Sequence, residues 1–88
     1  MDPEIEKIAY TTVAQQFAED PDTIHAGTRF VEDLGADSSA IAELQAAVET
    51  RLGLDLSDEI EGAAGVATVG DFARMLDATV SRLRYSNH

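Results

Sequence analysis

The stretch of sequence that decides the fold joins a loop to a helix and reads Phe30-Val31-Glu32-Asp33-Leu34-Gly35-Ala36-Asp37-Ser38-Ser39. Gly35 permits a tight backbone turn that a residue with a Cβ atom would resist. Asp37, Ser38 and Ser39 are all residue types that favour a helix N-cap. Beyond them, apolar residues recur at helical spacing, at Ile41, Leu44, Val48 and Leu52. The sequence therefore predicts a serine hydroxyl at or beside the N-terminus of an amphipathic helix, where free N–H groups and a partial positive charge suit a phosphate.

The run from Phe30 to Ser38 resembles, without a gap, the signature of acyl carrier proteins. In that family the serine directly after Leu-Gly-Ala-Asp carries a 4'-phosphopantetheine arm, and the matching residue is Ser38. The resemblance implies that a phosphopantetheinyl transferase attaches the arm from coenzyme A, using a magnesium ion bound by that enzyme. It also implies that Asp37 helps to orient the incoming transferase or its metal-bound coenzyme A. Ser39 is the rival attachment site, but it falls one residue late for the family register.

The same resemblance implies a freestanding carrier that is not itself an enzyme. Its arm would hold acyl groups as thioesters for fatty-acid or polyketide biosynthesis, and an aminoacyl cargo also stays open. The alternative function is an unmodified acidic module that binds other proteins through a carrier-like helical fold.

The composition fits one small acidic domain. The chain has 88 residues, 17 acidic and 6 basic, which gives a net charge of −11. Nucleic acid and anionic membranes repel such a chain, so we expect a monomer whose partners present basic patches. Cysteine is absent, which excludes disulfides and thiolate metal sites. No apolar run approaches a membrane span and the N-terminus is acidic, so the expected location is the cytoplasm.

Helical periodicity predicts a first helix over Pro3–Ala18, capped by Asp2 and stopped by Pro21. A long connection from Asp20 to Asp37 follows, with Ile24 and Phe30 as its anchors in the core. A connection of this length is usually either functional or disordered, and because it leads directly to Ser38 a functional loop is favoured.

Ser38–Leu52 forms the second predicted helix, and Gly53 its C-terminal cap. A weak short helix is expected over Ser57–Ala63. The last helix should begin at a capping box made by Thr68 and Asp71 and reach Arg84. Residues 1–84 then form the domain, and residues 85–88 a frayed tail.

These elements predict an all-α fold, a small four-helix bundle of three main helices and one short one, with a long loop between the first two helices. The family fold that the resemblance implies is the same. The expected core residues are Ile5, Val13, Phe17, Phe30, Leu34, Ile41, Leu44, Val48, Leu52, Phe72 and Leu76.

The second helix is also the part of the chain that departs most from the family pattern. In the family one face of this helix docks the transferase and acyl-processing enzymes such as ketosynthases and acyltransferases. The matching partner-binding positions are Ser39, Ala42, Glu43, Ala46 and Glu49. The family usually has leucine, isoleucine or methionine at position 39, often an acid at position 40, and larger apolar residues at positions 42, 45 and 46. These differences favour a specialised pathway. Glu32, Glu43 and Glu49 are candidates for ion pairs with basic partner surfaces.

Three other readings of the polar residues fit poorly. Ser38, His25 and Asp37 supply the residue types of a hydrolase triad, but Asp37 neighbours the serine and a Gly-x-Ser-x-Gly elbow is absent. A calcium loop starting at Asp20 would place His25 where glycine is needed and Val31 where glutamate is needed. The two histidines lack the spacing of a zinc site.

Overall fold

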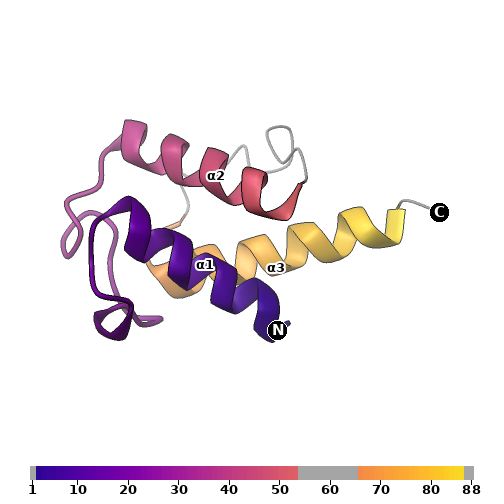
Figure 1. Cartoon of the computed structure of the whole chain (residues 1–88), viewed down its shortest axis with the longest axis horizontal. Helices are drawn as coiled ribbons and strands as arrows, with labels where there is room; N and C mark the ends of the chain where they lie inside the picture. Colours follow the sequence, from indigo (N-terminus) through magenta and orange to yellow (C-terminus); the bar gives the residue numbers. More distant parts are fainter. Residues whose placement is uncertain (1, 54–65, 87–88) are drawn as a thin grey trace.

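The structure, a computed structural model, describes residues 2–53 and 66–86. These described residues form three α-helices, α1 (Pro3–Gln16), α2 (Ser38–Leu52) and α3 (Val69–Ser86), and one 3₁₀ turn, η1 (Pro21–Thr23). Helix α1 packs against both α2 and α3, and the long loop between α1 and α2 occupies one end of the molecule (Figure 1). The described residues form no strand, only an isolated antiparallel bridge between Arg29 and Thr68. The all-α class is therefore confirmed, while the predicted short helix over Ser57–Ala63 lies outside the described residues.

Helix α1 begins as predicted but ends two residues early. The Asp2 side chain accepts a 2.9 Å hydrogen bond from the Glu4 N–H, and Pro3 is the first helical residue. At the other end Ala18 adopts a left-handed conformation, with φ +54°. This lets the Glu19 N–H bond to the Ala14 carbonyl at 2.8 Å, the arrangement of a Schellman motif. The predicted extension to Ala18 is wrong because the backbone itself turns there, before Pro21 is reached.

Helix α2 has the predicted bounds, Ser38–Leu52, and Gly53 closes it in a left-handed conformation with φ +67°. Helix α3 starts at the predicted capping box. The Asp71 N–H donates to the Thr68 hydroxyl at 3.1 Å, and the Thr68 N–H donates to the Asp71 carboxylate at 3.3 Å. The helix continues to Ser86, beyond the predicted end at Arg84.

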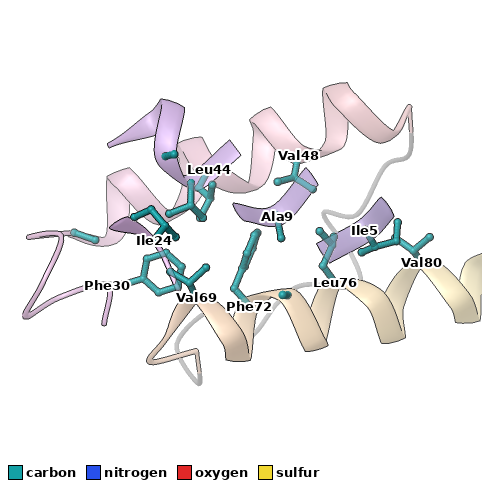
Figure 2. Packing of buried hydrophobic residues seen from close by; sticks show 14 residues of the cluster. Ile5, Ala9, Ile24, Phe30, Leu44, Val48, Val69, Phe72, Leu76 and Val80 are labelled. Atoms are coloured by element: carbon teal, nitrogen blue, oxygen red, sulfur yellow. The ribbon is translucent and has the colours of Figure 1, made fainter. Parts of the chain in front are cut away.

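Buried side chains from all three helices and the loop form one core (Figure 2). Phe30 is 1% exposed and its ring lies 6.2 Å from that of Phe17 and 6.1 Å from that of Phe72, edge-on to the latter. The loop is thus anchored by one aromatic side chain between α1 and α3. The predicted core residues that are fully buried are Ile5, Val13, Phe30, Leu44, Val48, Phe72 and Leu76. Those that pack at its margin, partly exposed, are Phe17, Leu34, Ile41 and Leu52.

A short backbone pairing ties the loop to the start of α3. The Phe30 N–H donates to the Ala67 carbonyl at 3.0 Å, and the Val69 N–H to the Thr28 carbonyl at 2.9 Å. The Gly70 N–H adds a 3.0 Å bond to the Ala26 carbonyl. A Cβ atom on Gly70 would lie 2.8 Å from that carbonyl oxygen, so only glycine allows the two backbones to approach this closely.

Candidate functional site

Ser38, the predicted attachment residue, is the first residue of α2 and its side chain is exposed. The helix is capped by Asp37, whose carboxylate accepts a 2.8 Å hydrogen bond from the Ala40 N–H. The Asp37 carbonyl accepts a further bond from the Ile41 N–H at 3.1 Å. Of the three residues that the sequence offered as caps, the structure selects Asp37. The Ser38 hydroxyl has no hydrogen-bond partner among the described residues, so it does not cap the helix.

The start of α2 is also suited to an anionic group. The N–H groups of Ser38 and Ser39 precede the first intrahelical bond and find no acceptor in the described part of the chain. Together with the helix dipole they place a partial positive charge beside the serine hydroxyl. A phosphodiester on Ser38 would therefore meet free donors and open space, so the residues fit such a group.

A tight turn leads the chain to this serine. The Gly35 N–H donates to the Val31 carbonyl at 3.1 Å and the Ala36 N–H to the Phe30 carbonyl at 2.9 Å. Gly35 has φ +65°, a value that glycine adopts without strain. Ala36 is buried and packs into the core. The turn therefore fixes the backbone up to Asp37 while Ser38 remains exposed.

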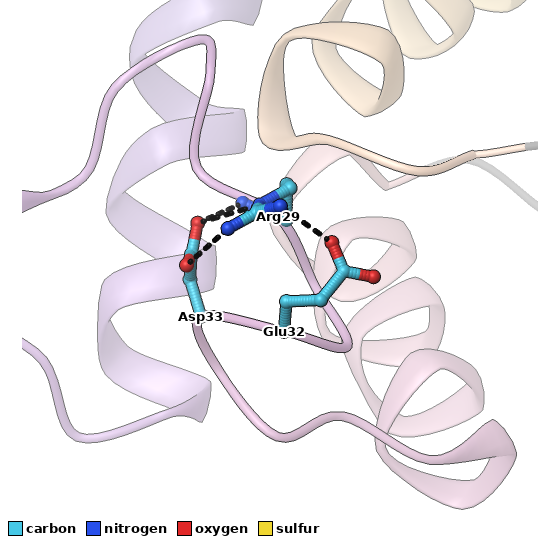
Figure 3. Close-up of polar contacts among 3 residues, drawn as sticks. All are labelled: Arg29, Glu32 and Asp33. Carbon is cyan, nitrogen blue, oxygen red and sulfur yellow. Dashed lines mark hydrogen bonds and ion pairs between the residues drawn. The ribbon is translucent and has the colours of Figure 1, made fainter.

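Arg29 clamps the same turn through two acidic residues (Figure 3). Its guanidinium lies 3.1 Å from the Glu32 carboxylate and 3.4 Å from that of Asp33. Its backbone N–H donates to Asp33 at 2.8 Å. This backbone bond is the main reason why the pKa of Asp33 is lowered, and the side-chain bond to Asp33 raises the pKa of Arg29. This pairing was not predicted, although acidic residues three and four positions after an arginine are the pattern that indicates it.

The clamp also changes the interpretation of Glu32. The sequence made it a candidate for pairing with basic partner surfaces, but in the structure it pairs with Arg29 within the turn. The pair is more than half exposed, so it contributes little to stability and can exchange partners.

The predicted partner-binding residues share the outer side of α2. The exposed side chains are Ser39, Ala42, Glu43 and Ala46, while Glu49 is half-buried. Positions 39, 42 and 46 follow at steps of three and four, so they lie on one face of the helix. Among them the structure shows small and acidic side chains and no large apolar one.

His25 and Asp20, the residues considered for a hydrolase triad and a calcium loop, make local contacts in the loop between α1 and α2. The His25 ring accepts a 3.1 Å bond from the Gly27 N–H through Nδ1, and no hydrogen bond joins it to Ser38 among the described residues. His25 instead lines a cavity of about 330 Å³ with Glu19 and Asp33. The Asp20 carboxylate caps η1 by accepting from the Asp22 N–H. Within residues 2–53 and 66–86 no cluster of three metal-ligating side chains occurs.

None of the described helices is both long enough and apolar enough to cross a membrane.

Comparison with known proteins identifies the family. Residues 10–76 match the family described as phosphopantetheine attachment site. Among curated relatives, the acyl carrier protein of Wolinella succinogenes is 38% identical over 65 residues, covering 74% of this chain and 83% of that protein. The acyl carrier proteins of Sulfurovum sp. and Bdellovibrio bacteriovorus are 37% and 40% identical over the same length, covering 84% and 81% of those proteins. The chain therefore belongs to the acyl carrier proteins, which are carriers and not catalysts and which bear a covalently attached 4'-phosphopantetheine group.

Proposed function

We propose that Ser38 is the residue that bears the 4'-phosphopantetheine group. The assignment rests on the family register, in which the attachment serine directly follows Leu-Gly-Ala-Asp, and residues 10–76 match the phosphopantetheine attachment family. The structure supports it, because Asp37 caps the helix and the exposed Ser38 hydroxyl has no hydrogen-bond partner among the described residues. Asp37 supports the site by capping the first turn of α2, the end of the helix whose free N–H groups suit a phosphate.

The arm, once attached, supplies a thiol that the cysteine-free chain lacks, and this thiol holds acyl groups as thioesters. The chain's own contribution is to present the attachment point on a rigid turn. Because the intermediate stays tethered, each processing enzyme meets it at high effective concentration.

The outer side of α2 is the proposed docking face for the phosphopantetheinyl transferase and for acyl-processing enzymes such as ketosynthases and acyltransferases. It is formed by Ser39, Ala42, Glu43, Ala46 and Glu49. The two glutamates and the net charge of −11 favour enzymes with basic patches around their active sites. The same charge opposes self-association, which supports a monomer. Docking of this electrostatic kind is brief, as a carrier that visits several enzymes requires.

Fatty-acid or polyketide biosynthesis is the proposed pathway class. The trimmed face of α2, with serine and alanine at positions 39, 42 and 46, supports a specialised set of enzymes. Assaying ketosynthases and acyltransferases of both pathways against the loaded carrier would decide between them, because only matched enzymes should accept it at low concentration.

The attachment itself is tested by intact mass after incubation with coenzyme A and a broad-specificity phosphopantetheinyl transferase. Wild type should gain one phosphopantetheine and Ser38→Ala none. A gain that survives in Ser38→Ala would move the site, with Ser39→Ala as the next variant. If neither gains mass while a control carrier is modified in parallel, the chain is an unmodified acidic interaction module.

A further inference from the structure

One apolar side chain near the proposed attachment site lies in water. Val31 is 67% exposed, and it is the only large apolar residue exposed within 2–53 and 66–84, where side chains are described. Its neighbour in sequence, Phe30, is fully buried, and Leu34 is half-buried in the same turn. A single exposed valine is unremarkable on most surfaces, so its significance depends on how it is held and on what surrounds Ser38.

The turn that carries Val31 is preorganised. The Asp33 and Leu34 N–H groups both bond to the Arg29 carbonyl, at 3.0 and 3.2 Å. The Val31 carbonyl accepts from the Gly35 N–H at 3.1 Å. The Arg29 guanidinium also forms ion pairs with Glu32 and Asp33, which lie in the same turn. Because the backbone is already ordered, a partner that buries Val31 orders little more chain and keeps most of the gain from apolar contact.

Val31 also lies within reach of any enzyme that acts on Ser38 directly. Gly35 is bonded to the Val31 carbonyl, and the three residues from Gly35 to Ser38 span at most about 11 Å. A specific interface covers about 800 Å² on each partner, a disc with a radius of roughly 16 Å. A footprint centred on Ser38 therefore extends to the turn.

Among the described residues near Ser38, few large apolar side chains are available for such a contact. Of the exposed positions of α2 nearest to Ser38, Ser39, Ala42 and Ala46 are small and Glu43 is charged. Interfaces concentrate their binding energy in a few large, well-buried side chains. Ile41 and Leu34 are half-buried against this chain's own core, so in the described part of the chain Val31 is the large apolar side chain that a partner can cover.

We propose that Val31 is an apolar docking contact for the phosphopantetheinyl transferase. This inference rests on the proposed attachment at Ser38 and assigns to the turn the apolar role that α2 lacks. The transferase is the natural occupant because it must bring its active site onto the Ser38 hydroxyl, whereas enzymes that act at the far end of the arm can stand further away. The matching surface on the transferase is an apolar recess beside its basic docking patch.

The test is steady-state kinetics of a broad-specificity transferase with coenzyme A on wild type, Val31→Thr and Val31→Ile. Threonine keeps the shape of valine but adds a hydroxyl, so KM should rise about three- to tenfold with kcat unchanged. Isoleucine should keep the wild-type KM. Ala78→Ser, an exposed substitution on α3, is the matched control and should change neither constant. An unchanged KM for Val31→Thr, or a fall in kcat alone, would overturn the proposal.

A double-mutant cycle provides an independent measurement should Val31→Thr disturb the turn. Ser39→Leu places a large apolar side chain at the start of α2, which provides a second apolar contact. In that background Val31→Thr should therefore raise KM less than it does in wild type. Equal effects in the two backgrounds would contradict a shared apolar interface. The failure of the proposed function looks different, because wild type itself would then remain unmodified beside a modified control carrier.

Discussion

Replacing Gly70 with alanine should destabilise the whole domain, although alanine is normally the better helix residue. The new Cβ atom would lie 2.8 Å from the Ala26 carbonyl oxygen and 2.9 Å from the Ala26 Cβ, where ordinary contacts begin at 3.4 Å. Both obstacles belong to the backbone or are fixed to it, so no side-chain rotation relieves them. The loop must move away from α3, which strains the 3.0 Å bond between the Gly70 N–H and the Ala26 carbonyl.

The size of the effect follows from two opposed terms. Overpacking of a close contact costs about 1–3 kcal/mol, and the strained hydrogen bond belongs to the same cost. Alanine returns roughly 0.5–1 kcal/mol through its lower conformational entropy in the unfolded chain. We expect a net loss near the middle of the range that these terms allow, about 1–1.5 kcal/mol, which lowers the midpoint of thermal unfolding by roughly 4–12 °C for a domain of this size.

The assay is thermal and urea unfolding followed by circular dichroism, with Gly27→Ala as the matched control. A Cβ atom on Gly27 meets only the His25 ring at 3.3 Å, and that ring can move. Gly27→Ala should therefore unfold within about 0.5 kcal/mol of wild type. If Gly70→Ala were as stable as Gly27→Ala, the close approach of the loop to α3 would not be the constraint that the distances indicate.

Three further predictions concern helix ends. Ala18→Gly should raise the free energy of unfolding in urea by about 0.5–1 kcal/mol, because it relieves an alanine held at φ +54°, and an unchanged midpoint would mean that the motif is unstrained. Asp37→Ala should lower the free energy of unfolding by about 0.5–2 kcal/mol in the same assay, while Ser38→Ala should leave it almost unchanged. Equal losses of stability in the two variants would assign the cap to both residues. Hydrogen bonding to Thr68 lowers the folded-state pKa of Asp71 below its unfolded value, so its stabilising effect is present above about pH 4 and is lost as the pH falls through the folded pKa. Wild type should unfold at a higher midpoint temperature than Asp71→Asn at about pH 6, and this difference should become smaller toward about pH 2.5. A difference in midpoint that stays constant with pH would exclude this titration.

Local signals predicted the helix ends wherever the responsible residues are neighbours in sequence. Asp2, Gly53 and the pair Thr68 and Asp71 were recognised as caps, and the structure confirms each of them. The end of α1 was missed because its left-handed residue is Ala18, a type that rarely adopts this conformation and so gives no signal. The order of the three polar residues at the start of α2 left the cap undecided, and only the geometry assigns it to Asp37.

Contacts between residues far apart in sequence could not be predicted from hydrophobic periodicity. The pairing of Thr28 with Val69 and the approach of Ala26 to Gly70 depend on how the loop folds back, which no window of sequence encodes. The small core residues were overlooked for a related reason. Ala9, Ala14 and Ala73 are almost fully buried, but alanine is common on both faces of a helix, whereas leucine or phenylalanine marks the inner face by itself.

The bond between the Phe30 N–H and the Ala67 carbonyl has a consequence for protein engineering. The Phe30 nitrogen and the Ala67 carbonyl oxygen, which flank residues 31–66, are 3.0 Å apart. This segment therefore begins and ends at nearly the same place on the frame, meaning the part of the domain formed by α1 and α3. A segment with such closely spaced ends can be exchanged as a cassette. Transplanting residues 31–66 of a different carrier, with Leu44 and Val48 retained toward α1, should give a hybrid that keeps this frame and acquires the donor's choice of enzymes.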